Sequence, residues 1–413
     1  MPGWFLLRQA VTAALTANAV RPVPGFRAAI PSMAAGWLTS ELAPHLLALT
    51  TADVVREATR PRPDRRALAL AGGSAVALAA MVAQSMRAKQ HVDRALVEAL
   101  GADYRDHLSA ADTDVDLGTP LRQLAMPFRV VDDEVEVLKD IAYDAEHGKR
   151  GLLDVYRPRD GVEKAPVLLQ VHGGGWSVGD KEHQGIPLML HMAARGWVCV
   201  AVNYRLSPRD AFPAHLVDVK RAIAWVREHG PSYGADPSFL AVTGGSAGGH
   251  LAALAALTPG DPEYQPGFEH ADTSVQAAVP HYGVYDFAGA IGTRRSRQLR
   301  DLFLGPRVLF EDPRTHLAEF EKASPLARVR ADAPPFFVIH GSSDSLVEVA
   351  QARAFVEALR GVSRQPVAYA ELPGTQHAFD VFPSFRSAGV LRGVARFLEW
   401  SHATRNDRLG SAR

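Results

Sequence analysis

The sequence predicts an α/β fold with a mostly parallel central sheet flanked by helices. Short apolar runs, typical of buried strands, alternate with helical segments from about residue 152 to residue 400. Such alternation favours right-handed crossovers between parallel strands. Near the middle of this region, the apolar run 239–242 leads into Gly-Gly-Ser-Ala-Gly at residues 244–248, and an Ala/Leu-rich helix follows. The chain therefore contains a strand, a tight glycine turn and a helix in direct succession.

Residues 1–125 have a different pattern, and we expect them to form a separate, mostly helical N-terminal region. They are rich in Ala and Leu and are interrupted by prolines, with a charged, Pro-containing spacer at 60–66. Residues 88–102 predict an amphipathic helix with Val92 and Leu96 on its apolar side. An acidic stretch at 111–116 predicts a loop close to the boundary. The remaining residues, 126–413, would form the α/β domain.

The segment 67–86 carries no charge and leaves two interpretations open. As a helix it would be about 30 Å long, which matches the hydrocarbon core of a bilayer. It is rich in alanine, however, and the Gly72-Gly73 pair weakens a helix. One interpretation is a membrane-associated region, with 33–55 as a hairpin partner; the other is a soluble, cap-like cover. The two correspond to a membrane-associated and a cytoplasmic localisation.

Strands and helices are expected in a regular order after residue 126. A leading antiparallel pair is predicted at 130–138 and 152–156, and a helix at about 216–229. The expected parallel strands are 167–171, 197–203, 239–242, 275–280, 335–339 and 367–372. The alternation of strands and helices is interrupted at about 287–323, a stretch much longer than an ordinary connection between two elements. We expect this insertion to form part of a cap over the sheet.

Composition excludes several classes of function. The chain has 413 residues, with 45 basic and 45 acidic side chains, so it lacks the basic surplus of a nucleic-acid-binding protein. Cys199 is the only cysteine and lies in an apolar run, so we expect a buried core residue and no disulfide. No pattern predicts a metal or an organic cofactor. The glycines around 244–249 lack the Lys-Ser/Thr pair of a phosphate-binding loop.

The glycine turn predicts a nucleophilic serine, Ser246, at its apex. A serine hydroxyl needs a base, an acid that orients the base, and donors for the oxyanion. Asp344 and His377 each follow a predicted strand, and the order Ser246, Asp344, His377 is that of hydrolases with this type of sheet. Asp286 is the alternative acid, but its loop lacks the glycine that follows His340. We expect His340 and His172 to have structural roles.

These motifs together resemble the hormone-sensitive-lipase-like family of α/β-hydrolase esterases, over about residues 152–400. The matching runs are His-Gly-Gly-Gly-Trp at 172–176, Tyr-Arg-Leu-Ser-Pro at 204–208, Gly-Ser-Ala-Gly-Gly at 245–249, His-Gly-x-x-Asp at 340–344 and Gly-x-x-His-x-Phe at 374–379. Gly245 departs from the family, which usually carries Asp before the serine. The resemblance implies that the backbone N–H groups of Gly173, Gly174 and Ala247 form the oxyanion hole, and we expect Trp176 at the pocket wall.

The expected function is a serine carboxylic-ester hydrolase that acts through an acyl-enzyme on small-molecule or lipid esters of short to medium chain length. An amidase, formamidase, deacetylase or lipase proper would use the same triad chemistry. A non-catalytic ligand-binding protein on the same fold is a further alternative, as in the plant gibberellin receptor. That receptor lacks the catalytic histidine, which this chain has at His377.

Overall fold

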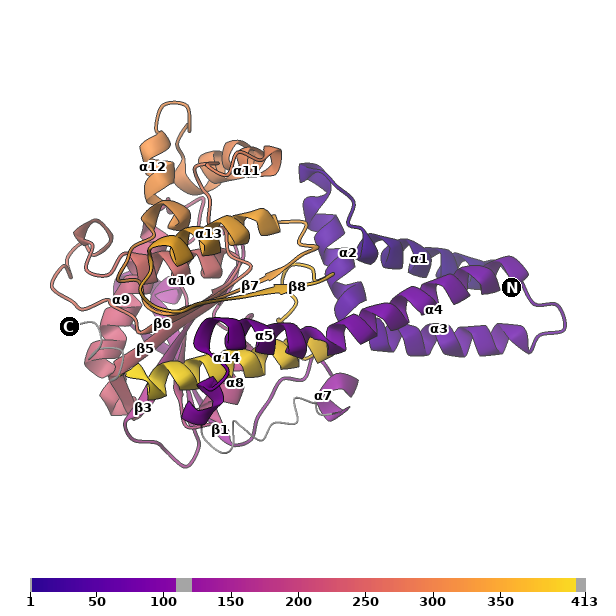
Figure 1. Cartoon of the computed structure of the whole chain (residues 1–413), viewed down its shortest axis with the longest axis horizontal. Helices are drawn as coiled ribbons and strands as arrows, with labels where there is room; N and C mark the ends of the chain where they lie inside the picture. Colours follow the sequence, from indigo (N-terminus) through magenta and orange to yellow (C-terminus); the bar gives the residue numbers. More distant parts are fainter. Residues whose placement is uncertain (1, 109–120, 406–413) are drawn as a thin grey trace.

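The computed structural model describes residues 2–108 and 121–405, so the acidic stretch at 111–116 lies outside the described residues (Figure 1). One sheet has the strand order β1-β2-β4-β3-β5-β6-β7-β8. Its strands are β1 (Val135–Ala142), β2 (Leu152–Pro158), β3 (Ala165–Val171), β4 (Val198–Val202), β5 (Ala235–Gly245), β6 (Ala277–His281), β7 (Phe336–Gly341) and β8 (Val367–Leu372). The pairs β1–β2 and β2–β4 are antiparallel, and the other neighbours are parallel. The mostly parallel sheet and its antiparallel leading pair confirm the prediction.

The first strand begins later than the sequence suggested. The prediction placed it at 130–138, whereas β1 runs from Val135 to Ala142. The backbone N–H of Glu134 donates to the carboxylate of Asp132 at 3.0 Å. This local hydrogen bond holds residues 132–134 in a turn, because a short acidic side chain competes with strand pairing for the backbone.

Helices cover both faces of the sheet. One face packs against α9 (Ala214–His229), α10 (Ala247–Leu257) and α13 (Val349–Val362). The other packs against α8 (Ile186–Ala193), α14 (Phe385–Ala403) and α5 (Ala88–Leu100). Neighbouring side chains of β3 alternate between these two cores, as the pleat of a strand requires. Cys199 is fully buried in the second core, as predicted.

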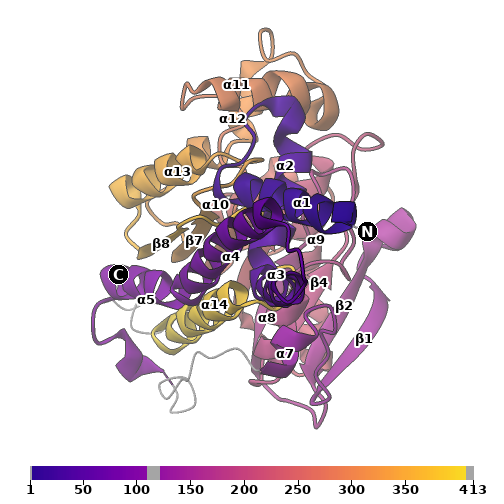
Figure 2. The same cartoon turned by 90° about the vertical axis from the view of Figure 1, so that its right-hand side faces the viewer.

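The stretch 287–323 is an insertion with its own short helices, as expected. It contains α11 (Arg294–Leu299), the π-helical segment η6 (Arg300–Leu309) and α12 (Leu317–Lys322). Figures 1 and 2 both show α11 and α12 next to each other at one side of the domain, beyond α13. The sheet therefore resumes at β7 only after this excursion.

The N-terminal helices divide into two groups. We call α1 (Pro2–Val20), α3 (Ala43–Ala58) and α4 (Arg65–Met86) the helical arm, because they pack on one another and extend away from the sheet (Figure 1). The helix α2 (Ala29–Glu41), preceded by the 3₁₀ turn η1 (Phe26–Ala28), lies where the arm meets the sheet domain (Figures 1 and 2).

The helix α5 continues from α4 and packs on β8 and α14. Its side chains Val92 and Leu96 are buried there, which confirms its predicted amphipathic pattern. A short helix, α7 (Leu121–Ala125), precedes the sheet. The division of the chain at about residue 125 stays a prediction, and α5 shares its hydrophobic core with the sheet.

Candidate active site

Ser246 lies between the end of β5 and the start of α10. Its backbone has φ 59° and ψ −119°, a conformation that a non-glycine residue adopts only when its surroundings enforce it. Two glycines make this turn sterically possible. A Cβ atom on Gly244 would lie 2.6 Å from the backbone of Gly248, and one on Gly248 would lie 2.1 Å from the carbonyl oxygen of Val171. The backbone N–H of Ser246 donates to the carbonyl of His281 at 3.0 Å, which fixes the turn to β6.

His377 and Asp344 form a buried pair on the loops after β8 and β7. The Nδ1 atom of His377 lies 2.6 Å from Oδ2 of Asp344. The other carboxylate oxygen accepts the backbone N–H groups of Leu346 and Val347 at 2.8 and 2.9 Å. Burial alone would raise the pKa of Asp344, but the charge of His377 and hydrogen bonds from His340 and His377 hold that pKa well below its usual range. Asp344 is therefore an ionised acceptor for His377.

The remaining ring nitrogen of His377 is free to act. Its Nε2 atom is buried and has no hydrogen-bond partner among the described residues, Ser246 included. The backbone N–H of His377 donates to the side-chain oxygen of Gln376, which also accepts from the N–H of Ser345. Gln376 thus connects the loop after β8, which carries His377 (the histidine loop), to the loop after β7, which carries Asp344 (the aspartate loop). The sequence did not predict this role, because a single Gln in a loop gives no signal.

Asp286, the alternative acid, has partners other than His377. Asp286 accepts the backbone N–H groups of Ala290 and Ile291 at 2.8 and 3.1 Å, and the hydroxyl of Ser296 at 2.7 Å. It therefore closes the turn at the start of the insertion. The Nε2 atom of His340 lies 3.0 Å from the carbonyl oxygen of Val347, within the aspartate loop.

The glycine loop after β3 places Gly173 and Gly174 beside the serine turn. His172 is buried and stacks on Tyr204 with ring centroids 4.3 Å apart, and burial lowers the pKa of His172 to about 4. Gly174 has φ 119°, and a Cβ atom there would lie 2.0 Å from the carbonyl oxygen of Val178. Only glycine fits this close approach of two backbone segments.

The three expected oxyanion donors are not equivalent. The backbone N–H of Gly173 donates to Oε1 of Gln184 at 2.8 Å, so in this structure that donor is occupied by a side-chain carbonyl. Ala247 is the first residue of α10, where the N–H has no acceptor within its own helix. Gln184 is a second residue that sequence analysis missed, since it lies in a loop without a recognisable motif.

A cavity of about 530 Å³ contains Ser246 and His377 in its wall. Trp176 also lines it, as expected, and its indole N–H donates to Nδ1 of His250 at 3.2 Å. The insertion contributes Leu299 and Phe303. The N-terminal segment contributes Phe26, Ile30 and Met33, which is consistent with the cap-like cover that the sequence left open, although the sequence did not single out these residues. Two regions outside the sheet thus enclose a mostly apolar space above the serine.

Metal ligands do not gather in the described parts of the chain. Within residues 2–108 and 121–405, no group of three or more His, Cys, Asp or Glu side chains is arranged to hold a metal ion. The expectation that no cofactor takes part stays a prediction.

Comparison with known proteins gives a consistent result. The family model BD-FAE matches residues 153–359. The chain is 45% identical to the probable carboxylic ester hydrolase LipM of Mycobacterium tuberculosis, over 97% of this chain and 94% of LipM. It is 43% identical to the esterase LipQ of the same organism, over 88% of this chain and 83% of LipQ. The butyrate-bound esterase Est2 of Thermogutta terrifontis aligns at 27% identity with a TM-score of 0.54, covering 64% of this chain and 94% of Est2. These likenesses confirm the predicted fold class.

Proposed function

This chain belongs to the hormone-sensitive-lipase-like family of α/β-hydrolase esterases and is a carboxylesterase-type hydrolase, and we propose that it works through a Ser246-His377-Asp344 triad. One observation carries the proposal. His377 is held by Asp344 through one ring nitrogen, while its other nitrogen is unpartnered among the described residues and its ring lines the same cavity as Ser246. This arrangement suits a histidine that exchanges protons with a serine.

In the proposed reaction, the Ser246 oxygen attacks the ester carbonyl carbon as Nε2 of His377 takes the hydroxyl proton. Asp344 stabilises the imidazolium that forms. The tetrahedral intermediate collapses, the bond to the alcohol oxygen breaks, and His377 returns the proton to that oxygen. A water molecule then cleaves the acyl-enzyme by the same steps and regenerates Ser246.

The developing oxyanion would accept hydrogen bonds from the N–H groups of Gly174 and Ala247. The N–H of Gly173 would join them once the side chain of Gln184 turns away, because Gln184 holds this donor in the structure. Loss of one such donor typically lowers turnover by about 10²–10³.

The proposed substrates are carboxylic esters with a short- to medium-chain, apolar acyl group. The cavity is large enough for such a group, and Phe26, Leu299 and Phe303 give it apolar walls. The butyrate in the Est2 structure supports a short acyl group in that relative. Amidase, formamidase and deacetylase activities remain alternatives, and so does a ligand-binding role without catalysis.

The test combines labelling and turnover. The wild-type protein should form a covalent adduct at Ser246 with a serine-reactive phosphonate and hydrolyse a chain-length series of p-nitrophenyl esters. S246A should form no adduct and lose about 10⁴–10⁶ in kcat. A wild-type protein that neither reacts nor hydrolyses would favour the ligand-binding alternative. Faster cleavage of an acyl amide than of the matched ester would favour an amidase.

We also propose that the helical arm associates with an anionic membrane. The helical stretch Arg65–Leu100 is long and apolar enough to cross a bilayer, and only 28% of its most apolar window is buried. In the arm, side chains between the helices include buried Thr16, Thr50 and Ser74, whereas Leu49 and Val76 are 65% and 73% exposed. The arm also buries an apolar cluster that includes Leu78 and Met81. Polar contacts between helices, together with exposed apolar side chains, suit helices that meet lipid.

The charge of the N-terminal region also supports an anionic membrane as the partner. The first 87 residues contain nine arginines and four carboxylates, although the whole chain has no net charge. Four of these arginines, Arg60, Arg62, Arg65 and Arg66, lie in or beside the connection between α3 and α4. This connection forms the far end of the arm (Figure 1). A basic end next to apolar helices suits the headgroups of an anionic bilayer.

Sedimentation with vesicles tests this association. The full-length protein should sediment with vesicles of phosphatidylcholine and phosphatidylglycerol. Replacing Leu49 and Val76 together by Asp should weaken binding at least about tenfold. V362D is the matched control, because Val362 is 45% exposed on α13 of the sheet domain. Full-length protein that stays in the supernatant, or an equal loss in V362D, would contradict the proposal.

A further inference from the structure

Three residues behind the serine connect the loops that carry the proposed triad. The backbone carbonyl of His281, at the end of β6, accepts the N–H of Ser246 at 3.0 Å. The N–H of Tyr282 donates to the carbonyl of Ile339 at 2.7 Å, on the strand that leads to Asp344. The end of β6 is therefore hydrogen-bonded to both the nucleophile turn and the aspartate strand.

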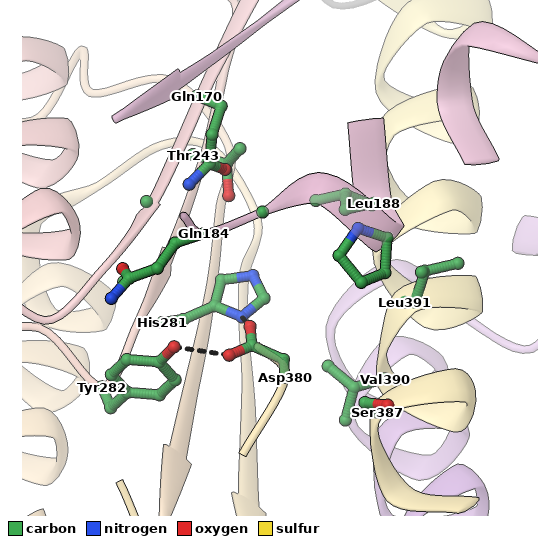
Figure 3. A pocket seen from close by; sticks show the side chains of 14 residues that line it. Gln170, Gln184, Leu188, Thr243, His281, Tyr282, Asp380, Ser387, Val390 and Leu391 are labelled. Atoms are coloured by element: carbon green, nitrogen blue, oxygen red, sulfur yellow. Dashed lines mark hydrogen bonds and ion pairs between the residues drawn. The ribbon is translucent and has the colours of Figure 1, made fainter. Parts of the chain in front are cut away.

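Asp380 connects this strand end to the histidine loop. It lies three residues after His377, and its carboxylate is 2.8 Å from Nδ1 of His281. The hydroxyl of Tyr282 donates to the same carboxylate. Figure 3 shows both side chains converging on Asp380. Burial alone would raise the pKa of Asp380, but the close contact and charge of His281 and the hydrogen bond from Tyr282 lower that pKa, so the carboxylate is ionised and accepts the Tyr282 hydroxyl.

Tyr282 also contacts the imidazole that the reaction uses. Its ring centroid lies 4.5 Å from that of His377, with the planes tilted by 56°. Tyr282 is only 2% exposed, so the ring has little room to move. A ring held at its hydroxyl end by Asp380 therefore limits where the His377 imidazole can lie.

Gly245 leaves room for the Tyr282 ring because it has no side chain. A Cβ atom at position 245 would lie 2.7 Å from the hydroxyl oxygen of Tyr282 and 2.8–2.9 Å from two of its ring carbons. Any larger residue before Ser246 would displace Tyr282. The space beside Ser246 is thus filled by the ring of Tyr282, and the carboxylate nearest to this ring is that of Asp380, on the loop that carries His377.

We propose that Tyr282 and Asp380 are positioning residues that hold the His377 imidazole in line with Ser246. Their proposed effect is on the position of His377, which Tyr282 contacts directly. Loss of their hydrogen bond would let the imidazole drift. A displacement of about 1 Å in a reacting group can lower turnover by about a hundredfold. Tyr282 also lines the cavity, but Y282F keeps its ring, so we expect substrate binding to change little.

The main test compares two tyrosines of the same segment. Y282F removes the hydroxyl and keeps the ring, and we expect kcat for a p-nitrophenyl ester to fall about tenfold, with KM changed less than twofold. Y285F is the matched control, since Tyr285 is also buried and its hydroxyl makes a long hydrogen bond to the carbonyl of Pro280, at 3.5 Å. Its kcat should stay within twofold of wild type. Equal kcat values for Y282F and wild type, or equal losses in Y282F and Y285F, would overturn the proposal.

Two further variants guard against a purely structural effect. D380A should lower kcat by about 10–100-fold. Combined with Y282F, it should be no worse than D380A alone, because D380A already removes the acceptor of the Tyr282 hydrogen bond. G245A should give the same kcat loss at constant KM, although it changes neither partner of that bond. Multiplicative losses in the double variant would contradict a shared role.

The inference rests on the proposed function, and the outcomes separate the two. An active S246A would refute the triad itself, whatever the tyrosine variants do. An inactive S246A beside a fully active Y282F would leave the triad intact and refute only the positioning role.

Discussion

The helical arm leaves more of its large apolar side chains exposed than the sheet domain does. Every residue of α10 is buried, and this helix consists mainly of alanine and leucine. The arm helices bury an apolar cluster that includes Leu78 and Met81, and they also bury Thr16, Thr50 and Ser74, whereas Leu49 and Val76 are 65% and 73% exposed. Burial of apolar surface drives folding in water, so the sheet domain has the pattern of a water-soluble core. The arm exposes more apolar side chains, which fits the membrane association proposed for it.

The two regions meet at α2, close to the histidine loop. Glu41 at the end of α2 pairs with the buried guanidinium of Arg386 and accepts the hydroxyl of Ser384 at 2.7 Å. Trp37 packs on Phe382 with ring centroids 5.5 Å apart. The arm is therefore joined to the sheet domain only a few residues beyond His377. A substitution in α2 should therefore change both the stability of the protein and the shape of the pocket.

The largest expected effect concerns the two carboxylates of the sheet domain. D344N should lower kcat by about 10³–10⁴, because an amide cannot hold the histidine tautomer or stabilise its cation. D286N should change kcat less than tenfold, since Asp286 bonds only to the start of the insertion. Steady-state hydrolysis of a p-nitrophenyl ester measures both. The reverse ranking would assign the acid to Asp286.

The next effect compares an ion pair at the junction with one inside the arm. E41A leaves the buried Arg386 unpaired, and we expect a loss of about 3–5 kcal/mol in the free energy of unfolding. D53A removes the partner of Arg8, whose side chain is 55% exposed, and should cost about 0–1 kcal/mol. Denaturant unfolding in detergent would measure both. Similar losses would mean that the arm and the junction are not energetically distinct.

Sequence patterns revealed the sheet and the proposed triad because both depend on local signals. Ser246, Asp344 and His377 each follow an apolar strand, and the carboxyl ends of parallel strands meet at one edge. Tyr282 also follows a strand, but a tyrosine there has no distinctive signal. Phe26 and Ile30 could not be placed, because their position over the pocket depends on how α2 docks more than 200 residues away in the sequence. The mainly small, apolar side chains of α4 also gave no clear indication of its buried face.

A smaller effect is the pH dependence of the stability that the buried carboxylate of Asp344 contributes. The pKa of Asp344 is lower in the folded protein than in the unfolded chain. Ionised Asp344 therefore stabilises the fold above the unfolded pKa of about 4, and this contribution is lost as the pH falls through the folded pKa. The difference in Tm between wild type and D344N should be largest near neutral pH and shrink by a few degrees below pH 4. Calorimetry across pH 2–7 checks this, and a difference independent of pH would contradict it.

The smallest expected effect tests whether the N-terminal segment shapes substrate choice. Ile30 lines the cavity although its side chain is 68% exposed, so part of it lies at the cavity rim and part faces outward. I30A should enlarge the rim and raise the kcat/KM ratio of long-chain over short-chain p-nitrophenyl esters by about threefold to tenfold. A hydrophobic contact of a few methylene groups discriminates by this order when it is partly exposed to solvent. L49A removes an equally exposed apolar side chain from the arm, away from the residues that line the cavity, and should leave the ratio unchanged. A changed ratio in both variants would indicate that the arm affects the pocket as a whole. An unchanged ratio in I30A would show that α2 does not contact the substrate and has only a structural contact with the loop that carries His377.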